Sequence, residues 1–131
     1  QEITLRDIGL CFADTALILD TVTIGGLPDS GGTIVGAHGM AATAPTGATT
    51  TLKYDVHRQR TTTSQTIFAT RLIWVTATNK ASAAVLSATA ADLKVYNGDQ
   101  LQLYCDDIGN TVAGADVGVT IEIRVDCPND D

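Results

Sequence analysis

The segments TTTLKYDVHR (Thr49–Arg58) and VGVTIEIRV (Val117–Val125) decide the fold class of this chain. Every second side chain is apolar from Leu52 to Val56 and from Val117 to Val125, and the side chains between are mostly polar. This is the period of a β-strand that packs one face on a core. A helix would instead place apolar residues at every third or fourth position. Both segments therefore predict strands with one buried face and one solvated face.

Shorter patterns of the same kind extend over the rest of the chain and predict about eight strands. Alternation or short apolar runs mark the further segments 3–12, 16–24, 33–37, 66–78 and 101–105. Glycine-rich turns separate several of them, including GGLPDSGG at 25–32 and Asn97-Gly98-Asp99. We expect a loop over 38–48, and either a short strand or a helical turn at Val85-Leu86. No stretch of ten or more residues has a helical period.

We predict a single all-β domain over residues 1–131, built as an antiparallel two-sheet sandwich. The twenty threonines and only two glutamates agree with a sheet rather than a helical protein. The first forty residues are expected either to complete the sandwich or to form an arm that contacts a neighbouring subunit. Residues 126–131 are expected to form an acidic tail.

The formal net charge of -7 argues against a nucleic-acid partner, since phosphate contacts need clustered Lys and Arg. The sequence also has no apolar run of membrane-spanning length. The region from Asp99 onward carries eight acidic residues against Arg124 alone. We interpret this acidic end as a solubilising surface or, alternatively, as a surface that docks onto a basic partner.

Signals for chemistry are weak, and we predict that the chain is not an enzyme and binds no cofactor. His38 lies in a glycine-rich loop and His57 on the polar face of a strand, where a solvated histidine is the usual case. The sequence contains no G-x-S-x-G, H-E-x-x-H or phosphate-binding loop. Solvated aspartates are expected at Asp106, Asp107 and Asp116 rather than a calcium site. The cysteines Cys11, Cys105 and Cys127 are expected to be free thiols, although one bridge among them is the alternative.

Two features are candidates for contact with a partner. One is the cluster Lys53, His57, Arg58 and Arg60, which could meet an acidic neighbour or the acidic end of a second copy. The other is the apolar stretch over 66–78, whose Phe68 and Trp74 we expect either in the core or at a subunit interface. The candidate interface residues are therefore Lys53, His57, Arg58, Arg60, Phe68 and Trp74.

Five short pieces follow one another from residue 44 onward, namely Ala44-Pro45, TTLKYDV (50–56), TIF (66–68), NGDQLQL (97–103) and DIGNTVAGADVGVTI (107–121). In their order and spacing, the chain resembles a domain of tailed-bacteriophage virion proteins. These pieces cover about two-thirds of the chain. The hairpin before TIF departs from the family pattern, because RQRTTTSQ replaces its usual glycine-containing turn. The resemblance implies a jelly-roll sandwich that often forms trimers.

The leading hypothesis from this resemblance is a capsid decoration (cement) protein. It would bind the major capsid protein on the outer surface of the virion and stabilise the shell, as a homo-oligomer for which a trimer is favoured. The alternative is a receptor- or glycan-binding module of a head fibre or tail. A small hydrolase on the same scaffold is a third reading, for which the sequence offers no supporting residues.

Overall fold

The computed structural model describes residues 1–7, 18–43, 51–75, 79–82, 84–107 and 115–126. These residues form almost only strands, with one helix, α1, at Ala90–Leu93. Among the described residues no helix is long and apolar enough to cross a membrane. The strands are β1 (Glu2–Asp7), β2 (Ile18–Thr23), β3 (Gly32–Thr43), β4 (Thr51–Arg60), β5 (Thr63–Thr66), β6 (Phe68–Thr70), β7 (Leu72–Val75), β8 (Val85–Leu86), β9 (Lys94–Val95), β10 (Gln100–Asp107) and β11 (Ala115–Val125).

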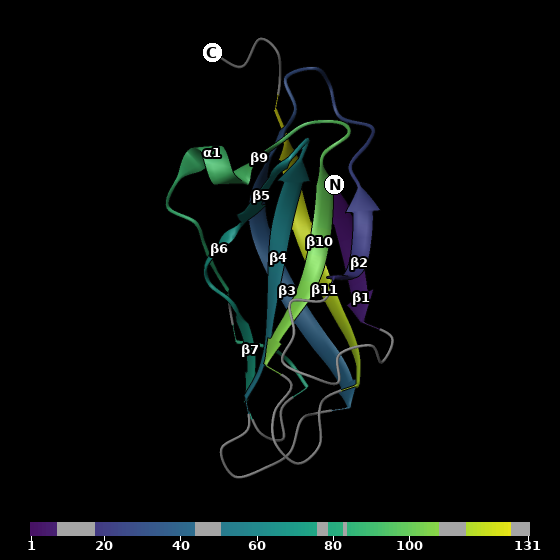
Figure 1. Cartoon of the computed structure of the whole chain (residues 1–131), viewed down its shortest axis with the longest axis vertical. Coiled ribbons are helices and arrows are strands. Elements are labelled where there is room, and N and C mark those ends of the chain that lie inside the picture. Colours follow the sequence, from purple (N-terminus) through teal and green to yellow (C-terminus); the bar gives the residue numbers. More distant parts are fainter. Residues whose placement is uncertain (8–17, 44–50, 76–78, 83, 108–114, 127–131) are drawn as a thin grey trace.

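Two antiparallel sheets face each other (Figure 1), which confirms the predicted sandwich. The first, called sheet A here, has the strand order β1-β11-β3-β9. The second, sheet B, has the order β2-β10-β4-β5, and β7 also pairs with β4. If β5 and β7 are counted as one interrupted strand, successive strands alternate between the two sheets except where β4 turns directly into β5. This is the connectivity of an eight-stranded jelly roll. A small third sheet, β6-β8, lies beside it.

The core lies between the sheets and is built from the alternation that the sequence predicted. Val117, Val119, Ile121 and Ile123 of β11 are all buried, as are Tyr54 and Val56 of β4. Trp74 of β7 is fully buried and meets Tyr54 edge to face, with ring centroids 5.5 Å apart. The Trp74 ring also lies against Gly39 of β3, where an added Cβ would be 2.5 Å from Cη2.

Two predicted elements are wrong in extent. The segment 66–78 is not one long strand, because its described part divides among the end of β5, then β6 and β7. The expected loop over 38–48 is also wrong in its first part, since β3 continues to Thr43. That part of β3 is rich in glycine and alanine and lacks a clear alternation, but it pairs with β11 along its length.

The described part of the first forty residues belongs to the sandwich. β1 is an edge strand of sheet A, β2 is an edge strand of sheet B, and β3 pairs with β11 inside sheet A. The turn expected at Asn97-Gly98-Asp99 is present. Gly98 has a φ of +92°, and Asp99 donates its backbone N–H to the carbonyl of Tyr96. This turn leads directly into β10.

Candidate functional site

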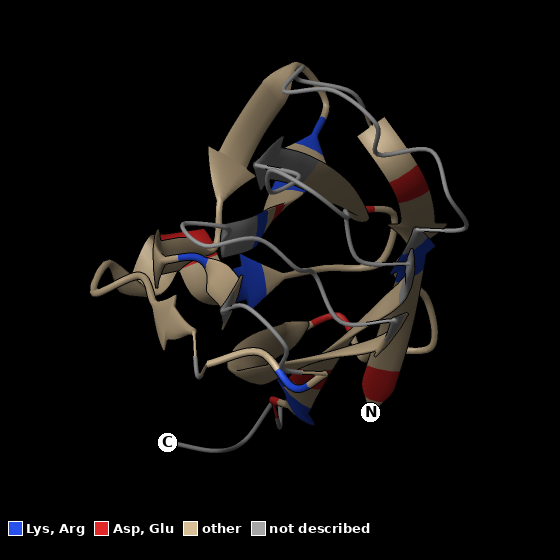
Figure 2. Cartoon of the chain, turned by 90° about the horizontal axis from the view of Figure 1, so that it is seen from below, with Lys and Arg blue, Asp and Glu red and all other residues tan. Residues whose placement is uncertain are grey.

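Strand β4 divides the predicted basic cluster between its two faces. Successive side chains of a strand point to opposite sides. Lys53 and His57 therefore lie on the outer face of sheet B, whereas Arg58 and Arg60 share the inward side with Tyr54. Arg58 is only 6% exposed. The four residues do not form one basic surface, and Figure 2 shows positive and negative residues interspersed around the strands.

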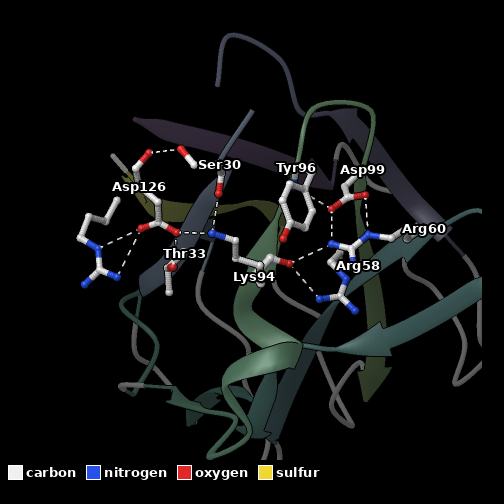
Figure 3. A network of polar contacts seen from close by, with 9 residues as sticks. Ser30, Thr33, Arg58, Arg60, Lys94, Tyr96, Asp99 and Asp126 are labelled. Carbon is white, nitrogen blue, oxygen red and sulfur yellow. Dashed lines mark hydrogen bonds and ion pairs between the residues drawn. The ribbon is translucent and has the colours of Figure 1, made fainter. Parts of the chain in front are cut away.

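Arg60 is held by Asp99 at the end of the sandwich (Figure 3). Its Nε and Nη2 donate to the two carboxylate oxygens of Asp99 at 2.9 and 2.6 Å, a bidentate arrangement. Asp99 Oδ2 also accepts the backbone N–H of Tyr96 at 2.9 Å. Burial opposes ionisation of Asp99, but the hydrogen bonds from Arg60 and Tyr96 outweigh it and lower the pKa of this carboxyl. The acidic partner of Arg60 is thus in the same chain.

Arg58 fixes the short helix to the same end. Its Nη1 donates to the carbonyls of Ala91, Asp92 and Lys94 at 2.7, 3.2 and 2.9 Å. These carbonyls lie at the end of α1 and the start of β9, where helical hydrogen bonding leaves acceptors free. Burial lowers the pKa of Arg58, with the nearby charge of Arg60 as a second cause. Arg58 therefore serves as a structural bridge from sheet B to the α1–β9 segment.

A second ion pair ties the start of the acidic tail to the sandwich. Lys94 Nζ contacts Asp126 Oδ2 at 2.5 Å and donates to the carbonyl of Ser30 at 2.6 Å. Thr33 Oγ1 donates to the same Asp126 oxygen at 2.9 Å. The hydrogen bond from Lys94 lowers the pKa of Asp126. Figure 3 shows this group side by side with the Arg60–Asp99 pair, with the Tyr96 ring between Lys94 and Arg60.

On the outer face of sheet B, a carboxylate, an imidazole and a hydroxyl group form a hydrogen-bonded series, called the Asp55–His57–Ser64 series here. Asp55 Oδ2 lies 3.0 Å from His57 Nε2, and His57 Nδ1 lies 2.9 Å from Ser64 Oγ. Asp55 is buried, and its other oxygen accepts Thr66 Oγ1 at 2.6 Å. Burial raises the pKa of Asp55, but hydrogen bonds from His57 and Thr66 and the charge of Arg71 bring it below its usual value. Ser64, the last member of this series, is exposed.

The Asp55–His57–Ser64 series has the residue types of a hydrolytic triad. A depression of about 280 Å³ lies on its Asp55 side and is lined by Lys53, Asp55, Thr66 and Arg71 among others. Because Asp55 and His57 belong to β4, and Ser64 and Thr66 to β5, these contacts also hold the two strands together.

The two predicted aromatic contacts are core residues of this chain. Phe68 is 5% exposed and Trp74 is fully buried. Of the two alternatives for the apolar stretch, the structure places both aromatic side chains in the core. The pairing roles of Asp55, Asp99 and Asp126 were not predicted from the sequence. Only Asp55 carried a local signal, because it is two residues from His57 on the same face of one strand.

Other expectations fall outside the described residues. These are the side chains of Asp106, Asp107 and Asp116 and those of the three cysteines. Within the described part of the chain, no group of three or more His, Cys, Asp or Glu is placed to hold a metal ion. Comparison with protein-family models, curated proteins and solved structures found no match.

Proposed function

We propose that this chain is a structural protein of a tailed-bacteriophage virion, acting as a capsid decoration protein that binds the major capsid protein. The observation that carries the proposal is the jelly-roll strand order of the two sheets. Viral capsid domains and lectins are common users of this architecture. A fold by itself does not determine function, so the proposal rests equally on the ordered sequence resemblance from residue 44 onward.

The charged groups support a mechanical role. Arg58, Arg60 and Lys94 bind acceptors of their own chain, and Asp99 and Asp126 receive them. These contacts join β4, the segment from β9 to the turn before β10, and the residue after β11, three parts of the chain that are distant in sequence. A module fastened in this way suits a protein that adds rigid contact area to a shell. Its partners in the proposal are the major capsid protein and further copies of itself, with a trimer favoured.

The test is binding of the purified chain to expanded capsid shells that lack it. We expect co-sedimentation with the shells, saturation at a fixed number of copies per capsid protein, and greater resistance of the loaded shells to heat. Sedimentation velocity of the free chain would report the oligomeric state. A strictly monomeric chain that leaves the shells unbound would contradict the proposal.

One observation favours the second candidate, a receptor- or glycan-binding module. Tyr96 is 40% exposed in the turn before β10, at one end of the sandwich. Aromatic rings at such ends are common contact groups because they offer a large surface at low entropic cost. A glycan array probed with the wild-type chain and with Tyr96→Ala distinguishes the two functions. Hits that the substitution removes would support recognition, and an empty array would contradict it.

A further inference from the structure

In the part of the chain that the structure describes, one edge of sheet A is paired at both ends but open in the middle. At the first end, Gly32 and Thr33 of β3 pair with Val95 and Lys94 of β9. At the other end, Met40 forms an isolated antiparallel bridge with Lys80. The chain thus lies next to β3, on the side away from β11, at two separate places. It leaves this position, called the lane beside β3 here, after residue 81 and returns to it at residue 94, and it forms β8 and α1 in between.

The open part of β3 presents backbone groups that can pair with another strand. Gly39 accepts the N–H of Ala81 at 3.1 Å, and Ala41 donates its N–H to Asn79 at 2.7 Å. Backbone groups alternate in direction along a strand, so those of Ala37 also point away from β11 and into the lane. Among the described residues no backbone group pairs with Ala37 from that side. The open stretch over 34–38 is roughly 16 Å long.

A groove of about 360 Å³ follows this stretch, which is a volume at the lower end of the range for ligand sites. Its apolar lining includes Ala37, Ala81, Ala84 and Leu86. Lys80 also lines it, is exposed, and has no ion pair among the described residues. Three large apolar side chains in or next to the groove lining are about half exposed. Val35 (47%) belongs to the lining, and Met40 (54%) and Val85 (53%) are sequence neighbours of lining residues.

We propose that this groove binds an extended segment of a partner polypeptide, which adds a short strand to β3 next to Ala37. Backbone hydrogen bonds would supply much of the affinity, as in other cases of strand addition. The small lining favours a short aliphatic side chain facing inward. Lys80, which has no ion pair among the described residues, favours a carboxylate on the next, outward-facing position of that segment. The proposal goes beyond the virion role and does not depend on it.

The geometry favours a single strand over the sheet edge of a second copy. β9 and Lys80 occupy the lane on either side of the open stretch, so the edge is recessed between them. A terminus or a loop in extended conformation can enter such a gap. The edge of another sandwich carries neighbouring strands and would meet these flanking segments first.

The experiment titrates the isotope-labelled full chain with two acetylated peptides, VEVEVEV and VKVKVKV, and follows the backbone amide signals by NMR. We expect VEVEVEV to shift the Ala37 amide and to slow its hydrogen exchange. VKVKVKV should bind about tenfold more weakly, the equivalent of one charge-assisted contact. Shifts that fall away from the groove, or no shift by either peptide up to about 1 mM, would overturn the proposal. Equal affinities would overturn the role of Lys80.

Variants then test the groove itself. Ala37→Pro removes the free N–H without touching the groups that face β11, and it should abolish binding. Ala84→Trp fills the groove from the other wall and covers the case in which the proline variant does not fold. Its matched control is Ala69→Trp, which alters the depression on sheet B. Lys80→Glu should reverse the preference between the peptides, whereas Lys53→Glu should not. Unchanged binding by Ala84→Trp would refute the site.

Discussion

Replacing Asp99 by alanine should destabilise the fold through the loss of three hydrogen bonds at one carboxylate. Arg60 donates two of them and the backbone N–H of Tyr96 donates the third, at 2.6 to 2.9 Å. Asp99 is 4% exposed, so water cannot fully replace the carboxylate. The side chain of Arg60 is 38% exposed, which weakens its share of the effect by solvent screening.

The expected loss is about 2 kcal/mol in the free energy of unfolding. About 1 kcal/mol comes from the hydrogen bond that the backbone N–H of Tyr96 donates to the carboxylate, which also fixes the turn before β10. A further contribution of about 1 kcal/mol remains for the charged pair after the discount for exposure. For a domain of this size the sum lowers Tm by roughly 6–10 °C.

Urea unfolding followed by tryptophan fluorescence measures this change. Trp74 is the one tryptophan of the chain and is fully buried, so its emission reports the core directly. Asp29→Ala is the matched control, because Asp29 is exposed. The double variant with Arg60→Ala should show a coupling of about 1 kcal/mol. Additive effects of the two substitutions would refute the pairing as an energetic contact.

The Asp99→Ala variant also tests how the contribution of Asp99 to stability depends on pH. The pKa of Asp99 is lowered in the folded state. Its contribution to stability is therefore present above the unfolded pKa of about 4 and is lost as the pH falls through the folded value. The difference between wild type and Asp99→Ala should thus shrink between about pH 5 and pH 2. A difference that stays constant over this range would contradict the ionic origin of the effect.

Three further substitutions test other parts of the fold by urea unfolding. Asp55→Asn should cost about 1–2 kcal/mol at neutral pH, and the loss should disappear in acid because the pKa of this carboxyl is also lowered; a loss that persists at low pH would argue against the charge. Gly39→Ala should cost about 1–3 kcal/mol because its Cβ would be 2.5 Å from the Trp74 ring, while Gly25→Ala, which meets no atom within 4 Å, is the control. Thr61→Gly should stabilise by about 0.5–1 kcal/mol because Thr61 has a φ of +53°, and a destabilised variant would show that the threonine side chain contributes more than its strain.

The strands that alternate clearly could be predicted from the sequence, and so could the first part of β3, but its second part could not. β11 buries Val117, Val119, Ile121 and Ile123 as its pattern requires. Val125 continues the pattern but is 50% exposed. Alternation indicates which face of a strand is buried, but it does not indicate how far along the strand the rest of the protein covers that face. The second half of β3 was expected to be a loop. Gly39 accommodates the Trp74 ring there, a long-range contact that no local pattern reveals.

The predicted basic cluster shows which features of a site can be read from neighbouring residues in the sequence and which cannot. Once β4 is known to be a strand, its odd-numbered and even-numbered residues must face opposite sides of the sheet. This places Lys53 and His57 on one face and Arg58 and Arg60 on the other. The partner of Arg60 does not follow in this way. Asp99 is 39 residues further along the chain and reaches Arg60 only because β10 pairs with β4. The acidic end therefore looked available for another molecule.

The chain leaves the edge of β3 after residue 81 and returns at Lys94, and this excursion explains both the open stretch of β3 and the carbonyls that Arg58 binds. A continuous antiparallel strand would span the seven positions from Met40 back to Thr33 with seven of its own, but 14 separate their partners Lys80 and Lys94. Instead α1 projects from the lane, and Arg58 holds its free carbonyls from the opposite sheet. A buried arginine with three carbonyl acceptors is a costly way to close a core unless the excursion itself is needed. Because Arg58 binds the carbonyls of Ala91, Asp92 and Lys94, it fixes the segment after which the chain returns to β3, and the stretch of β3 before Met40 stays open among the described residues.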